Sequence, residues 1–388
     1  MKQQVTLSAL TLSLLTASFL TSASQQGATA QFQALSGVDK FNAAPLQVAD
    51  IKKQVAKNIA LSLSGVNAQL QLQLNQYQDT VPLEQVAVST QTKRLVAEAN
   101  QYTRQLKGLS DNNSNLYQLR LADNEMLTAW QQGQIPLIAF APKGDDKDWQ
   151  YVEAYDHQGQ LHLLDAHTLP QRPVLIVELD SAQVKREGLA VMRRVFAEHG
   201  MAMPSQDVTV SDEAQPLSTS VLKRIRLNDD EEPWISGAAE VYGVVTGVNP
   251  SRDEPVLDIV DMPYLDHDGR DYTPNQILIH WQRYRWQAAD VLLMEQDDNT
   301  NYQELATTFL DIVTQVMRTI PDPNVQGYAI IPQLTNQLIK AMPSHWFSND
   351  DDYVDVFYTL FEGQTYQGHM GASGNARITL EPLTINPR

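Results

Sequence analysis

The chain contains no cysteine, which excludes disulfide bonds, thiol chemistry and a cysteine-linked lipid anchor. Basic residues are also scarce: 28 Lys and Arg stand against 46 Asp and Glu, a formal net charge of −18. Nucleic-acid binding needs Lys and Arg to neutralise phosphates, so we expect no nucleic-acid partner. After the first 20 residues no apolar run reaches the roughly 18 residues of a membrane span, so we expect no transmembrane segment.

The first segment has the pattern of an export signal. Lys2 gives it a positive start, and the apolar run from Val5 to Leu20 is too short to remain as a spanning helix. Small residues follow, which predicts cleavage after Ala23 or after Ala30. We therefore predict that residues 1–23 are a signal peptide and that the protein is exported, either to the periplasm or outside the cell.

Apolar periodicity divides the remaining chain into three parts. Residues 24–130 carry apolar side chains at helical spacing, which predicts a helical N-terminal region ending in a short helix through Trp130. Alternating apolar residues and turns containing Gly-Asp or Gln-Gly predict a small antiparallel β-rich domain with one helix at 131–210. Short strands at close spacing predict a β-sandwich at 211–388, interrupted by a helical insertion at 302–342. The predicted fold class is α+β.

The acidic residues are concentrated in the predicted sandwich. Residues 211–388 hold 27 acids and 11 bases, a net of −16, which leaves 46−27=19 acids and 28−11=17 bases in residues 1–210. The acids fall in clusters beside predicted strands. The three principal clusters contain Asp229 and Asp230, Asp297 and Asp298, and Asp350 and Asp352.

The topology of the sandwich predicts where these clusters lie. If the strand at 353–361 is the antiparallel neighbour of the strand at 290–295, their two clusters share one end of the sheet. The strand at 220–227 leads to the third cluster, so all three loops are expected to converge there. Neighbouring carboxylates repel one another unless a cation or solvent compensates.

Calcium fits such a loop cluster, because it accepts six to eight oxygen ligands in tolerant geometry. Neutral oxygen donors at Asn299, Asn301 and Asn349 favour calcium further. We predict a calcium site formed by Asp229, Asp230, Asp297, Asp298, Asp350 and Asp352. The alternative is that these acids lie in solvated loops without a metal.

Three further segments are weaker candidates. The run 266–271, Asp-His-Asp-Gly-Arg-Asp, matches a calcium loop only in part and is typical of an Asp-Gly turn. His157, His162 and His167 have no zinc-type spacing and are interpreted as surface histidines. The aromatic and arginine run at 280–286 predicts a strand, with one face in the core or a stacking platform for a ligand.

Three segments of the chain resemble a known family. They are VLDIVDMPYLDHDGRDY, ILIHWQRYRWQAADVLLMEQDDNTNY and DDDYVDVFYTLFEGQTY with GASGNARITLEP. They are similar to domain-of-unknown-function family 3103, exported proteins of marine gammaproteobacteria. The resemblance implies export and a shared architecture, and brings no activity and no catalytic residue. More distantly, the loop arrangement resembles the calcium-dependent lipid-binding sandwich of the protein-kinase-C type, in which acidic loops hold calcium.

These observations predict an exported, calcium-binding protein that acts as a structural or interaction module. Its partner would be calcium, together with a cell-surface or extracellular polymer. The alternative is a secreted hydrolase of peptide, glycan or lipid, with a site between the middle and C-terminal domains. No G-x-S-x-G elbow, phosphate loop or dinucleotide fingerprint occurs, so the sequence predicts no catalytic residue.

Overall fold

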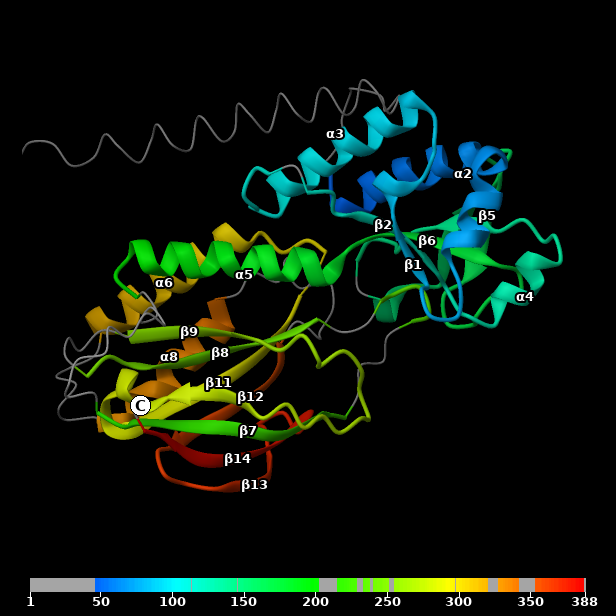
Figure 1. The fold of residues 1–388 in the computed structure, drawn as a ribbon. Coiled ribbons are helices and arrows are strands. Elements are labelled where there is room, and N and C mark those ends of the chain that lie inside the picture. The colour runs from blue at the N-terminus through cyan, green and yellow to red at the C-terminus, as the bar shows by residue number, and fades with distance from the viewer. Residues whose placement is uncertain are drawn as a thin grey trace, which may run out of the picture.

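The protein folds into a six-stranded sheet with its helices, followed by a β-sandwich covered by further helices (Figure 1). This confirms the predicted α+β class. The computed structural model describes residues 46–112, 114–144, 146–201, 215–228, 233–237, 240–250, 255–296, 298–319, 327–341 and 353–386.

The first sheet combines strands from two of the predicted parts. In spatial order its strands are β1 (Thr80–Pro82), β2 (Tyr117–Leu121), β6 (Val174–Leu179), β3 (Leu137–Ala139), β4 (Tyr151–Tyr155) and β5 (Leu161–Asp165). All neighbours are antiparallel except β3 and β6, which are parallel. Helix α2 (Val48–Gln73) packs on this sheet, and α3 (Thr90–Leu106) packs on α2.

The predicted helix through Trp130 is wrong over most of its length. Tyr117, Leu119 and Leu121 are buried at alternate positions, which is the period of a strand, and this segment forms β2. Only a short helix, α4 (Met126–Gln131), follows. The prediction failed because β2 obtains its partners, β1 and β6, from distant parts of the chain.

The sandwich consists of two four-stranded sheets around a shared core. One sheet has the order β10 (Gln276–His280), β7 (Leu217–Leu227), β14 (Ala376–Ile385) and β13 (Tyr366–Met370). The other has the order β12 (Tyr353–Phe361), β11 (Ala288–Glu295), β8 (Val241–Val248) and β9 (Pro255–Asp261). Strands β11 and β12 are antiparallel neighbours, which fulfils the condition on which the predicted convergence of their acidic clusters rested.

Three helices cover the outer face of the sheet that contains β11 (Figure 1). They are α5 (Ser181–Glu198), α6 (Tyr302–Thr319) and α8 (Ile330–Ala341). Helix α5 packs on α6 and β9, while α8 packs on β8, β11 and β12. The predicted helical insertion is thus confirmed by α6 and α8. One continuous hydrophobic core joins these helices to α2 and the first sheet.

The predicted strand over 280–286 is wrong. Strand β10 ends at His280, and two short 3₁₀ turns follow at Trp281–Arg283 and Arg285–Gln287. Trp286 reverses the chain with φ 60. The alternating aromatic and basic residues of this segment therefore lie in two tight turns and not in a strand.

The partners of this segment explain why it turns. The Arg283 guanidinium forms a two-pronged ion pair with the buried Asp258 carboxylate. The Tyr284 hydroxyl donates to the same carboxylate at 2.5 Å, and its ring lies against Gly247. Trp281 and Tyr284 are both buried with edge-to-face rings, so the interpretation of this run as core is the one that the structure supports.

Candidate functional sites

Three strand ends beside the acidic clusters lie at one end of the sandwich. Strand β7 ends at Leu227, opposite Ala376 of β14. Strand β11 ends at Glu295, and its neighbour β12 begins at Tyr353, which pairs with Met294. We call the end of the sandwich at Leu227, Glu295 and Tyr353 the acidic end.

The buried Asp355 carboxylate connects the two sheets at the acidic end. Its Oδ2 accepts a hydrogen bond from the backbone N–H of Ala376 at 2.7 Å, and its Oδ1 accepts from the N–H of Ser373 at 2.8 Å. Asp355 is paired with Leu293 of β11. Its hydrogen bonds to Ser373 and Ala376 therefore hold strands β11 and β12 of one sheet next to strands β7 and β14 of the other. Sequence reasoning missed Asp355, since a lone aspartate within a strand gives no signal.

Of the six predicted calcium ligands, the structure describes Asp298. Its Oδ2 forms an ion pair with Lys52 of α2, and its backbone carbonyl accepts from Lys107 Nζ at 2.8 Å. Burial acts to raise the pKa of Asp298, but Lys52 and Lys107 outweigh it and lower the pKa below its ordinary value. Asp229, Asp230, Asp297, Asp350 and Asp352 lie outside the described residues.

The acidic end faces the first sheet and its helices. Arg120 of β2 donates from Nη2 to the carbonyls of Ile235 and Ser236 at 3.1 and 2.9 Å. Trp234 Nε1 donates to the Asp165 carbonyl at 3.0 Å. Arg120 also pairs with Glu178 at 2.7 Å, so its charge is already compensated, whereas Lys52 and Lys107 direct their charges to Asp298.

A second site is a groove of about 580 Å³ along α3. We call it the α3 groove. Such a volume is within the range of small-molecule sites. Its lining residues are Leu83, Glu84, Val88, Lys93, Val96, Ala97, Asn100, Gln101, Arg104, Asp111, Asn112 and Asn115.

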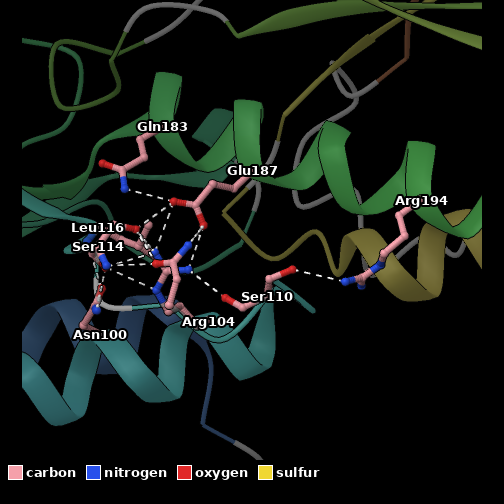
Figure 2. A network of polar contacts seen from close by, with 9 residues as sticks. Asn100, Arg104, Ser110, Ser114, Leu116, Gln183, Glu187 and Arg194 are labelled. Carbon is pink, nitrogen blue, oxygen red and sulfur yellow. Dashed lines mark hydrogen bonds and ion pairs between the residues drawn. The ribbon is translucent and has the colours of Figure 1, made fainter. Parts of the chain in front are cut away.

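A polar network fixes one end of the α3 groove (Figure 2). Arg104, which is 3 % exposed, donates to both oxygens of Glu187 on α5, at 2.7 and 3.2 Å. It also donates to the carbonyls of Ser110 and Ser114, at 3.0 and 2.9 Å. Every guanidinium nitrogen of Arg104 therefore has a protein partner.

Glu187 is held in its charged form by this network. Burial acts to raise its pKa, but hydrogen bonds from Arg104, Gln183 and Ser114 outweigh burial and lower the pKa of Glu187 to about 2. Asn100 also fixes this loop: its side chain donates a hydrogen bond to the Ser114 carbonyl and accepts one from the Leu116 N–H at 2.8 Å. The loop after α3 is thus fixed to both α3 and α5.

The weaker sequence candidates form ordinary local contacts. Gly269 has φ 59 within the 266–271 turn, where Asp266 accepts from the Tyr272 hydroxyl and Asp271 pairs with Arg224. His162 lies 3.0 Å from Asp156 in the β4–β5 hairpin. Within the described ranges, no three His, Asp or Glu side chains are grouped as a metal site.

No pattern in the sequence indicates the α3 groove. The residues that line it lie between positions 83 and 115. Tertiary contacts bring them together: α3 packs on α2, and Arg104 of α3 binds Glu187 of α5. A stretch of Asn, Gln and charged residues on a helix is normally interpreted as a solvated face.

Comparison with known proteins identifies a family and no activity. No curated protein and no solved structure matches the chain. In the part of the chain that the structure describes, no helix is long and apolar enough to cross a membrane. The model of one family, described as "Protein of unknown function (DUF3103)", matches residues 52–388. This match spans nearly all of both sheet regions, so the chain belongs to the DUF3103 family of proteins of unknown function.

Proposed function

We propose that this protein is an exported, calcium-binding module with a structural or interaction role, and that the loops at the acidic end hold the ion. The supporting observation is the convergence of strand ends at Leu227, Glu295 and Tyr353. Each is followed or preceded within three residues by aspartates. This short connection along the chain supports the proposal that the three clusters share one end of the sandwich.

Asp298, the member of the ligand set that the structure describes, already has a partner. Because Asp298 is paired with Lys52, the proposal depends mainly on Asp229, Asp230, Asp297, Asp350 and Asp352. Carboxylates concentrated in this way repel one another, and a bound calcium ion would remove the repulsion. A calcium ion at the acidic end would also present a positive site to an acidic cell-surface or extracellular polymer.

Thermal melting tests the proposal. A ligand that binds only the native state adds about 2.7 kcal/mol of stability at 100 times its Kd, so millimolar calcium should raise Tm relative to a chelator. Magnesium at the same concentration should have a smaller effect, because it demands stricter octahedral geometry.

Two double variants provide the comparison. Asp297→Asn with Asp352→Asn should abolish the calcium-dependent rise in Tm. Asp266→Asn with Asp268→Asn removes the same charge from the 266–271 turn and should preserve it. An equal Tm in calcium and in chelator for the unmodified protein contradicts the proposal.

Export is part of the same proposal and rests on the pattern of residues 1–23. Recovery of the protein from the periplasmic or extracellular fraction, with an N-terminus at Ser24 or Gln31, is the expected result. Retention of the whole chain in the cytoplasm would contradict it.

A further inference from the structure

We infer that the α3 groove binds a short peptide in extended conformation, with a free amino terminus at the Asp111 end and a free carboxylate at the Lys93 end. This inference does not depend on calcium or on the acidic end. It rests on the length of the groove, on its charge and on its apolar wall.

The length of the groove follows from its lining. Lys93, Ala97, Asn100 and Arg104 recur at helical spacing and line one face of α3. At a rise of about 1.5 Å per residue, Lys93 and Arg104 are about 16 Å apart along the helix axis. An extended peptide rises about 3.3 Å per residue, so about five residues match that length.

The charges of the groove favour a peptide over an anion. Arg104 is neutralised by Glu187 and bonded to two carbonyls, which leaves Lys93 as the exposed cation of the lining. Glu84 and Asp111 are exposed acids on the same lining. With more acid than available base, the groove would repel a phosphate or a dicarboxylate and accept an ammonium group.

The two ends of the groove differ in charge. Asp111 follows the last turn of α3, beside the Arg104 network, whereas Lys93 lies in the first turn. A peptide amino group would therefore meet Asp111, and a peptide carboxylate would meet Lys93. Glu84 follows β1, whose Pro82 pairs with Gln118 of β2, and adds a second acid to the lining.

The remaining lining fits side chains and peptide groups. Leu83, Val88 and Val96 are buried apolar residues that supply one wall. Gln101 and Asn115 carry amide groups of the kind that pair with a peptide backbone. A sugar is less suited, because the lining includes no aromatic ring among the described residues on which a sugar could stack.

The test is a titration of the full chain with the peptide Ala-Leu-Ala-Leu-Ala, followed by calorimetry. Saturable binding with Kd below about 1 mM is expected for the peptide with free ends. Ala97 is exposed on the groove face of α3, so Ala97→Trp fills the groove without disturbing the core and should weaken binding at least about tenfold.

Gln91→Trp is the matched control. Gln91 is exposed and does not line the groove; at 100° per residue it is rotated by about 120° around α3 from Ala97. This variant should bind the peptide as the unmodified protein does. Circular dichroism and Tm for both variants establish that the fold is retained.

The polarity of binding is tested separately. Lys93→Gln should weaken binding of the free-ended peptide about two- to fivefold and leave the C-amidated peptide unaffected, as expected for an exposed ion pair. N-acetylation should weaken binding by a similar factor through Asp111. Three outcomes would overturn the inference: no saturable peptide binding, equal binding by Ala97→Trp, or competition by inorganic phosphate or glucose.

Discussion

Asp290 and Asp355 are fully buried in adjacent strands of the sandwich, yet their surroundings differ. Asp355 accepts three backbone N–H groups, from Val356, Ser373 and Ala376. Asp290 accepts one, from Thr359 at 2.7 Å, and its Oδ2 has no hydrogen-bond partner within the described part of the chain. The neighbouring Thr335 hydroxyl is bonded to Thr246 and to the Ile331 carbonyl.

This environment makes the charge of Asp290 costly. Burial raises the pKa of Asp290 to about 6, although the Thr359 amide and the Thr335 hydroxyl act to lower it. The native state therefore holds a proton that the unfolded chain releases between about pH 4 and pH 6. Stability from this group is complete below pH 4 and is lost as the pH rises through 6.

Asp290→Asn should remove this loss. Relative to the unmodified protein, the variant should gain stability as the pH rises from 4 to 7, by about 3 kcal/mol at most, because Asn stays neutral. Urea unfolding of both proteins at pH 4, 5, 6 and 7 measures the difference. An identical difference at every pH would show that the carboxyl is not the cause.

At the level of secondary-structure elements, the sequence predicted those helices and strands in which the spacing of apolar residues matches the spacing of buried residues. Helices α6 and α8 and strands β11 and β12 were predicted correctly. The helices carry apolar residues at helical spacing, and β11 is an apolar run buried on both faces, with Leu292 in one core and Val291 and Leu293 in the other. The errors at β2 and at 281–287 have a different origin. Both segments are shaped by distant partners: β1 and β6 for β2, and Asp258 for Arg283 and Tyr284.

Helix packing gives a prediction from two glycines. Gly188 of α5 lies against the ring of the buried Tyr302 on α6, where a Cβ would overlap the ring. Gly188→Ala should therefore destabilise the protein by about 1–3 kcal/mol, as overpacking does. Gly65 of α2 faces open space, so Gly65→Ala should stabilise by about 0.5–1 kcal/mol through helix propensity.

Denaturant unfolding of the two glycine variants checks this packing. The two substitutions add the same methyl group to a helix interior, so opposite signs isolate the α5–α6 contact. A stabilising Gly188→Ala would mean that α5 and α6 are not packed as described.

At the level of the whole molecule, the first sheet and the sandwich share one core and a set of polar contacts. Ile235 and Tyr242 of the sandwich region belong to the same hydrophobic core as α2 and β6. Lys52 forms an ion pair with Asp298, and Arg120 donates hydrogen bonds to the backbone carbonyls of Ile235 and Ser236. Apolar periodicity divided the chain into separate parts, and it could not reveal these contacts because their residues are far apart in sequence.

Two adjacent lysines of α2 test this connection. Lys52 is 4 % exposed and pairs with Asp298, which is 35 % exposed, whereas Lys53 (41 %) pairs with Glu153 (35 %) at the surface. Lys52→Met leaves Asp298 without that partner and should cost about 1–3 kcal/mol, between surface and fully buried pairs. Lys53→Met should cost less than about 1 kcal/mol.

Chemical denaturation of Asp298→Asn alone, of each lysine variant alone and of each lysine variant combined with Asp298→Asn completes two double-mutant cycles. Coupling between Lys52 and Asp298 and none between Lys53 and Asp298 is expected. Equal, small losses in both lysine variants would mean that the ion pair contributes nothing to joining the two regions.

The central claim, calcium at the acidic end, is tested most directly by calorimetric titration of calcium into chelator-treated protein. Saturable binding is predicted for the unmodified chain and for Asp266→Asn with Asp268→Asn, and its loss is predicted for Asp297→Asn with Asp352→Asn. No saturable binding, or binding that survives the last pair of substitutions, would contradict the account.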